Sequence, residues 1–350
     1  MSHDLDVVVV GAGVMGAATA RSLAAAGRRV ALVERFAVGH HRGSSHGSSR
    51  IFRLSYPEAR WVRLAQESLG AWRALEAESG QTLLSLHGGL DIGDEVPVHE
   101  RALREAGAAC ERLDAAALAG RFGVVAAPPE IPVLAHPDAG IAHAERAWRA
   151  LVTRAVAHGC EVYEETVAQR LRQSGDGVEV DCGEATLHAG AAVVTAGAWA
   201  TPLLATAGIR LDTTVTRETV AFFALPDGPA PSVVEWGEPA MYALDAPAMG
   251  QAPALKAGVH HAGQVVDPDT AGEPAADLVE QAIQWVRRRF PSADPRPLEA
   301  QTCLYTSTPD HDFVLRREGR IVVGSPCSGH GFKFAPVVGA RLAALAAEAL

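Results

Sequence analysis

The first 34 residues constrain the fold of this chain more than any other segment. A run of β-branched apolar residues at 7–10 predicts a strand buried on both faces, and residues 30–33 predict a second. Between them, residues 14–26 are rich in alanine and are followed by Gly27, which is typical of a helix and its C-terminus. A strand, a helix and a strand in this order predict a parallel sheet.

The turn between the first strand and the helix carries three glycines, Gly11, Gly13 and Gly16. Such glycines allow a tight turn, and the helix N-terminus presents free N–H groups to a pyrophosphate. Glu34 ends the second strand, where a carboxylate can accept hydrogen bonds from an adenosine ribose. A glycine-rich turn without a ligand is the alternative, but the combination favours a dinucleotide. Glu34 would repel a 2′-phosphate, so NADP is disfavoured, and FAD and NAD remain open.

An apolar strand followed by a turn or a helix recurs in the middle and at the end of the chain. An apolar strand at 193–196 leads into Gly197, which weakly favours FAD, and a strand at 321–323 precedes a helix at 337–349. Residues 210–262 instead alternate in the manner of β-strands. We therefore expect an α/β fold with a discontinuous cofactor domain and an inserted β-sheet-rich substrate domain. The cofactor domain would comprise residues 1–82, 140–212 and 300–350, and the substrate domain residues 83–139 and 213–299.

Composition excludes several other classes of protein. The formal net charge of −10 argues against partners such as nucleic acid or anionic membrane surfaces. Five cysteines, an odd number, suit a reducing cytoplasm better than secretion. Asp4 and Asp6 precede the first apolar run, so we expect no signal peptide. The longest stretch without charge or histidine, residues 189–209, is interrupted by glycines and a proline and does not predict a membrane span.

Lysine is rare in this chain: 29 of the 31 basic residues are arginine, and the two lysines are Lys256 and Lys333. Lys256 lies in a predicted strand at 253–260, four residues before His260, so both would share one face. A lysine on an apolar strand requires a partner or a function, unless the strand is an edge strand with the lysine in water. Lys333 follows a glycine-rich turn suited to close contact with a ligand. An ordinary strand-to-helix turn is the alternative there.

A polar loop at 39–49 continues into further candidate residues. Its small residues would let the backbone approach a flat ring, and His46, Arg50 and Arg53 could supply positive charge to a carboxylate or a reduced flavin. A solvated loop with isolated charges is the competing interpretation. Cys303 taken singly is most simply a small buried residue. No cysteine or histidine pair has the spacing of a metal site, so we expect no metal.

Six motifs in order make the chain resemble the monomeric sarcosine oxidase family of FAD-dependent amine oxidases, which includes N-methyltryptophan oxidase and pipecolate oxidase. They are GAGVMG at 11–16, SHGSSRIFR at 45–53, LKAGVH at 255–260, VVDPDT at 265–270, CLYTSTPD at 303–310 and SGHGFKFAPVVG at 328–339. The resemblance implies a Rossmann-like, glutathione-reductase-like FAD-binding domain. It also implies a monomer that acts on a small-molecule amino acid and oxygen, and the cysteine count places it in the cytoplasm.

The resemblance further implies roles for individual residues. Lys256 would hold a water near flavin N5 and promote the reaction with oxygen, and Arg53 and Lys333 would grip the substrate carboxylate. Cys303 would attach the flavin covalently through its 8α carbon. Tyr242, His260 and Tyr305 would line the substrate amine. The implied cofactor-binding residues are Gly11, Gly13, Gly16, Glu34, Arg35, His46, Ser49, Arg50, Val167, Gly197, Cys303, Gly329, Gly331 and Lys333.

The chain also departs from the family pattern in ways that leave the substrate open. Residues 243–255 form a segment about three residues longer than in sarcosine oxidase, which affects the assignment of Tyr242. Pro326-Cys327 replaces a Gly-Phe or Gly-Leu pair, and Val259 replaces a tyrosine. We expect an oxidase of a secondary or cyclic amino acid that yields an imine and hydrogen peroxide. A dehydrogenase with another acceptor, a biosynthetic flavin oxidase of a larger amine, an NAD-binding protein and a non-catalytic flavoprotein are the alternatives.

Overall fold

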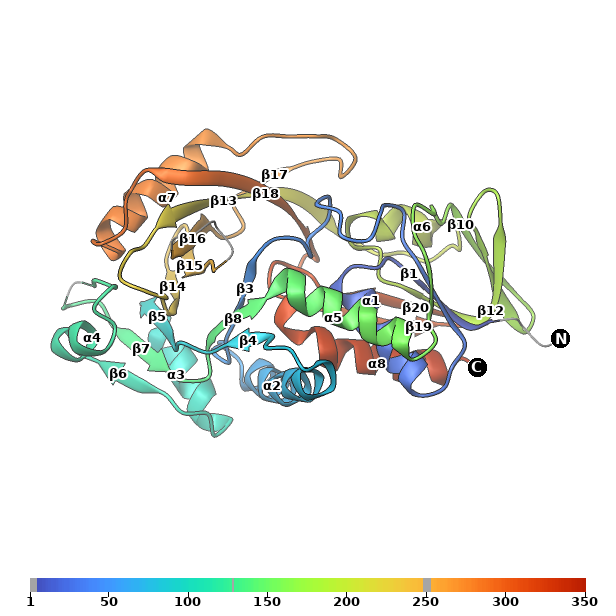
Figure 1. Ribbon diagram of the computed structural model, residues 1–350, viewed down its shortest axis with the longest axis horizontal. Coiled ribbons are helices and arrows are strands. Elements are labelled where there is room, and N and C mark those ends of the chain that lie inside the picture. Colours follow the sequence, from blue (N-terminus) through green and yellow to red (C-terminus); the bar gives the residue numbers. More distant parts are fainter. Residues whose placement is uncertain (1–4, 128, 248–252) are drawn as a thin grey trace.

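The computed structural model describes residues 5–127, 129–247 and 253–350, which build two large sheets and a small one between them (Figure 1). In the first large sheet, β1 (Leu5–Val10) lies between β2 (Val30–Val33) and β12 (Thr186–Val194), and all three are parallel. The parallel strands β9 (Glu161–Tyr163) and β20 (Ile321–Ser325) extend it on either side. Antiparallel strands complete it: β10 (Arg170–Ser174), β11 (Gly177–Asp181) and β19 (Val314–Glu318).

Both faces of this sheet are covered, which explains why its strands are continuous apolar runs. Val7 and Val9 pack into one hydrophobic core, and Val8 and Val10 pack into another on the opposite face. The first core is closed by α1 (Val14–Ala25), α2 (Ala59–Ser79), α5 (Ala144–Ala157) and α8 (Ala335–Ala347), the second by α6 (Ala200–Ala205). The predicted strand–helix–strand unit and its parallel sheet are thus confirmed.

The second large sheet is mostly antiparallel. At its centre β16 (Ala254–Val259) lies between β13 (Thr214–Ala224) and β15 (Met241–Asp245). The remaining strands are β5 (Gly89–Gly93), β6 (Glu111–Leu113), β7 (Val133–His136), β14 (Ser232–Trp236), β17 (Gln264–Val265) and β18 (Pro297–Ser307). The helix α7 (Ala276–Arg289) packs Leu278, Trp285 and Val286 into the core of this sheet. Two further helices, α3 (Val96–Glu105) and α4 (Ala115–Arg121), lie near its β6 end (Figure 1). The predicted α/β fold with a separate β-rich sheet is confirmed.

A small sheet links the two large ones. It consists of β3 (Ser49–Phe52), β8 (Gly140–His143) and β4 (Leu84–Ser85) (Figure 1). Ser49 Oγ donates a hydrogen bond of 2.8 Å to the carbonyl oxygen of Asp245 in β15. The expected loop at 39–49 is therefore followed by a strand, β3. The pairing of β3 with β8 fixes the polar loop between the sheets.

The packing of the β1–α1 turn gives a stability prediction. A Cβ added at Gly16 would overlap the carbonyl oxygen of Gly11 and lie 2.7 Å from Thr195 Oγ1. Because backbone cannot move aside cheaply, we expect Gly16→Ala to lower the free energy of unfolding by about 1–3 kcal/mol. Thermal unfolding checks this. Gly70→Ala is the matched control, since a Cβ there meets nothing within 4 Å on α2 and should stabilise the helix by up to about 1 kcal/mol. Equal effects of the two substitutions would contradict the packing argument.

Candidate active site

A cavity of about 290 Å³ runs between the two large sheets, from the β1–α1 turn to Lys333. It collects side chains and backbone from segments far apart in the sequence. Every site residue predicted from the sequence lines it except Gly16, which lies behind the turn and packs against Gly11. The lining residues are Gly11, Gly13, Glu34, Arg35, His46, Ser49, Arg50, Arg53, Val167, Gly197, Tyr242, Lys256, His260, Cys303, Tyr305, Gly329, Gly331 and Lys333.

The end of the cavity at β1 is held rigidly by hydrogen bonds. Glu34 is 6% exposed, and its carboxylate accepts hydrogen bonds from the backbone N–H of Ala12 at 2.8 Å and of Phe36 at 3.1 Å. Trp148 Nε1 donates to the carbonyl oxygen of Ala12 at 2.6 Å. Gly11 has a φ of 98°, and a Cβ there would approach the Thr195 carbonyl oxygen to 2.7 Å. Only glycine therefore suits this position.

Arg50 organises the loop that carries His46. Its guanidinium donates to the carbonyl oxygens of Ser44, His46 and Ser49 at 2.8, 2.6 and 2.9 Å. Burial, with a contribution from Arg50, lowers the pKa of His46 to about 3. Burial thus favours the neutral ring of His46, in contrast to the expectation that it supplies positive charge. Its buried Nε2 has no hydrogen-bond partner, which is the mark of a site built for a further group.

Lys256 lies on the central strand β16 and is only 7% exposed, so the edge-strand interpretation is wrong. Its Nζ lies 3.5 Å from the carbonyl oxygen of Ser49 and 5.9 Å from the centre of the Phe222 ring. Burial, followed by the charge of Arg50, lowers the pKa of Lys256 to about 7. An anionic group in the cavity would oppose that shift and stabilise the ammonium form.

Cys303 lies on β18, which pairs along its length with β13 and places Cys303 opposite Glu218. Burial raises the pKa of the Cys303 thiol, while the neighbouring charges of Arg50 and Lys256 lower it. The thiol thus faces the cavity in the same electropositive region as Lys256. Cys327 also lines this region, and its sulfur accepts a 3.4 Å hydrogen bond from the backbone N–H of Thr306.

Two cationic side chains meet at the far end of the cavity. The guanidinium of Arg53 lies between two rings, 4.8 Å from the centre of Tyr56 and 5.1 Å from that of Trp236. Lys333 is 5% exposed and donates hydrogen bonds of 2.9 Å to Tyr56 Oη and to the carbonyl oxygen of His330. Burial, followed by the charge of Arg53, lowers the pKa of Lys333. Desolvated cations on a cavity wall attract an anion, and one carboxylate can form ion pairs with both Arg53 and Lys333.

Aromatic groups form another part of the wall. The His260 ring centre is 6.2 Å from that of Tyr242 and 5.8 Å from that of Tyr305. Burial lowers the pKa of His260, so the ring is neutral. Gly329 has a φ of 72°, and a Cβ there would press on Tyr305 and His260. This wall suits the apolar body of a small ligand.

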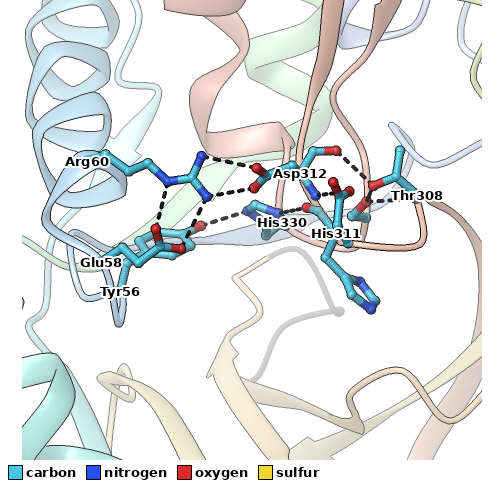
Figure 2. A network of polar contacts seen from close by, with 9 residues as sticks. Tyr56, Glu58, Arg60, Thr308, His311, Asp312 and His330 are labelled. Atoms are coloured by element: carbon cyan, nitrogen blue, oxygen red, sulfur yellow. Dashed lines mark hydrogen bonds and ion pairs between the residues drawn. The ribbon is translucent and has the colours of Figure 1, made fainter.

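A network of hydrogen bonds and ion pairs stabilises the edge of the cavity beside Lys333 (Figure 2). Tyr56 Oη is 3.1 Å from His330 Nδ1, and His330 Nε2 is 3.1 Å from the carbonyl oxygen of His311. Arg60 binds Asp312 with two hydrogen bonds of 3.0 Å and also contacts Glu58. The network ties the start of α2 to the loop after β18, so it holds Tyr56 and thereby the ammonium of Lys333 in place.

Several functional candidates escaped the sequence analysis. Tyr56 and Trp236 enclose Arg53, and Asp91 lies behind it. Asp91 carried a usable signal, because it is an acidic residue within an apolar strand, whereas nothing local marks Tyr56 or Trp236. Residues 248–252 of the predicted longer segment lie outside the described residues. Within the described ranges, no cluster of three or more histidine, cysteine or acidic residues could hold a metal ion.

The residues fit FAD: a rigid glycine turn and a carboxylate lie at one end, and the unpaired His46 and the thiol of Cys303 lie further along. The family model "FAD dependent oxidoreductase" matches residues 6–345, and the chain belongs to this family.

Among the described residues, the helices are too short or too polar to cross a membrane.

Individual relatives are similar over almost the whole chain. A protein from Streptomyces avermitilis named monomeric sarcosine oxidase is 33% identical, with 99% of this chain and 94% of the relative covered. A probable sarcosine oxidase from Arabidopsis thaliana is 32% identical, with 98% and 88% covered. Among solved structures, NikD, described as an unusual amino acid oxidase essential for nikkomycin biosynthesis, superposes with a TM-score of 0.89 at 27% identity, with 99% and 95% covered. The resemblance drawn from the six motifs is thus confirmed.

Proposed function

We propose that this protein is an FAD-dependent oxidase of a secondary or cyclic amino acid, and that it produces an imine and hydrogen peroxide. The observation that carries the proposal is the pair of cations, the half-buried Arg53 and the buried Lys333, at one end of the cavity that also holds Lys256 and Cys303. A carboxylate clamp in the same cavity as a dinucleotide turn supports an amino acid as the substrate. The relatives named sarcosine oxidase support the same reaction class.

In the proposed arrangement each part of the chain has a separate task. Arg53 would bind the substrate carboxylate through two parallel N–H bonds, and Lys333 would add a compact point charge. The neutral His260 and the rings of Tyr242 and Tyr305 would exclude water around the amine. The chemistry that bound FAD would supply is two-electron oxidation of the substrate, with oxygen as the final acceptor. Fixing the substrate C–H bond in one orientation is positional catalysis.

Lys256 would promote the oxygen reaction. Its ammonium is compact and buried on a central strand, so it can stabilise negative charge as that charge develops on oxygen. Glu34, Arg35, Val167 and Gly197 would hold the adenosine and ribose part of the cofactor. Ser49, Arg50, Gly329 and Gly331 would contact its ring system through backbone and side chain.

We also propose that Cys303 carries the FAD covalently. Protein precipitated with acid should keep its yellow colour in the pellet, because a thioether survives denaturation, whereas Cys303→Ala should release the flavin into the supernatant. Absorbance of the two fractions near the flavin maximum measures this. Cys327→Ala is the matched control, since that thiol lines the same cavity and should leave the flavin bound. Complete release from the unsubstituted protein would contradict covalent attachment.

An anaerobic screen tests the reaction class. The holoenzyme is mixed without oxygen with sarcosine, N-methyl amino acids, proline and pipecolate, and loss of flavin absorbance is followed. Bleaching by a secondary or cyclic amino acid, but not by the amine that lacks its carboxylate, is the expected result. Bleaching followed by slow recovery in air would instead support a dehydrogenase that uses another acceptor. Absence of bleaching by every amino acid would contradict the proposal.

A further inference from the structure

Behind the two cations of the cavity lies a buried carboxylate that neither the family resemblance nor the relatives assign. Asp91 lies in the middle of β5, between β14 and β7, and is fully buried. Its Oδ1 accepts a 2.8 Å hydrogen bond from Trp236 Nε1 and lies 3.7 Å from the Arg53 guanidinium. Its Oδ2 lies 3.2 Å from His136 Nε2. Arg53 and Trp236 line the cavity, and Asp91 does not.

The surroundings of Asp91 favour its ionised form. Burial by itself would raise its pKa, but the contact with His136 and the charge of Arg53 hold the pKa of Asp91 below its ordinary value. His99, by contrast, is neutral: burial lowers its pKa to about 4, and its Nδ1 is 2.8 Å from Ser55 Oγ. Asp91 is therefore an anionic neighbour of Arg53 on the side away from the cavity, and its other carboxylate oxygen contacts His136.

This neighbour changes the charge balance of the clamp. Arg53 and Lys333 are both desolvated, and each cation needs an opposite charge nearby. Asp91 compensates the charge of Arg53 from behind, so the pair requires one further negative charge in the cavity. The hydrogen bond to Trp236 also fixes the ring that lies against the guanidinium, which holds Arg53 in position.

We infer that Asp91 is a positioning residue that acts as the built-in counter-ion of Arg53 and restricts the site to substrates with a single carboxylate. The inference rests on the proposed role of Arg53 and Lys333 as the carboxylate clamp. It specifies the substrate class more narrowly, as a monocarboxylic amino acid, and excludes amino acids with an acidic side chain directed at the clamp.

Binding of simple carboxylates to the holoenzyme tests this inference without turnover. Calorimetric titration in chloride-free buffer compares benzoate with the uncharged benzamide. Asp91→Asn keeps an acceptor for Trp236 Nε1 but removes the charge, so it should bind benzoate at least about fivefold more tightly and benzamide with unchanged affinity. Benzoate should also raise the melting temperature of Asp91→Asn more than that of the unsubstituted protein, because it replaces the missing counter-charge.

Glu235→Gln is the matched control. Glu235 is likewise a strand carboxylate that accepts from a tryptophan, Trp285, and binds an arginine, Arg289, but it does not line the cavity. Its substitution should lower the melting temperature without changing the affinity for benzoate. A purely structural role for Asp91 would give Asp91→Asn the same behaviour and would overturn the inference.

A second measurement needs no variant. Phthalate and phthalamate are similar in size, but phthalate carries a second carboxylate, so the unsubstituted protein should bind phthalamate at least about tenfold more tightly. Equal affinity for the two would overturn the inference.

The variant Arg53→Met distinguishes failure of the inference about Asp91 from failure of the proposed carboxylate clamp. If Arg53→Met binds benzoate as well as the unsubstituted protein does, the clamp itself is wrong. If Arg53→Met loses binding while Asp91→Asn gains none, only the role of Asp91 fails.

Discussion

Replacement of Lys256 by methionine is expected to slow the reaction of the reduced enzyme with oxygen by about 10²–10³-fold. The physical reason is the loss of the compact buried positive charge that would stabilise negative charge on oxygen. Methionine has a similar length and fills the same space, so substrate binding should change little. Stopped-flow absorbance measures the two half-reactions separately, first reduction by substrate without oxygen and then reoxidation with oxygen.

The anaerobic half-reaction is the internal control for Lys256→Met. Flavin reduction should slow by less than about tenfold, and the melting temperature should not fall, because removing a buried ammonium relieves its desolvation cost. Equal slowing of both half-reactions would remove Lys256 from the oxygen reaction and assign it to substrate or cofactor positioning.

Arg53→Met is expected to lower kcat/KM for the amino acid substrate by about 10²–10³-fold. A bidentate charge-assisted hydrogen bond contributes roughly 3–4 kcal/mol, and about 1.4 kcal/mol corresponds to each tenfold change in rate, which gives this factor. The main effect should fall on KM, and kcat should also fall because the reacting C–H bond is no longer held in one orientation. Steady-state kinetics with the substrate found in the anaerobic screen provide the measurement.

The specificity of this effect can be checked with two comparisons. The amine that lacks the carboxylate should react equally slowly with the unsubstituted protein and with Arg53→Met. Arg63→Met removes a cation of α2 that pairs with Glu105 outside the main cavity, and it should change kcat/KM for the amino acid by less than about tenfold. A large loss for the carboxylate-free amine with Arg53→Met would mean that the substitution damages the fold and not the clamp.

The cofactor-binding part of the fold could be predicted from the sequence because the patterns that indicate it lie within short segments. The apolar runs of β1, β2 and β12, the glycine turn and Glu34 lie within short segments whose pattern reflects burial on both faces of a parallel sheet. The strand β18 was missed. Its first half is largely exposed and lacks the alternation of a strand, and its pairing with β13, some 80 residues earlier in the chain, fixes it as a strand.

The same difference between local and long-range signals applies to the residues of the site. Lys256, Arg53 and Lys333 stood out by residue type and motif, and the structure brings them to one cavity. The residues that pack around Arg53 could not be predicted from the sequence. Asp91, Tyr56 and Trp236 meet Arg53 only because β5 pairs with β14 and the start of α2 folds back beside Lys333. The neutrality of His46 likewise depends on burial, which no sequence pattern shows.

We propose that an amino acid is oxidised in this cavity and that oxygen receives the electrons. The stoichiometry of turnover in air tests this most directly, with the amino acid that bleaches the flavin anaerobically. One hydrogen peroxide should form and one oxygen should be consumed for each amino acid oxidised, with reoxidation fast enough to sustain turnover. Substrate oxidation that proceeds only with an added electron acceptor, and yields no peroxide, would contradict it.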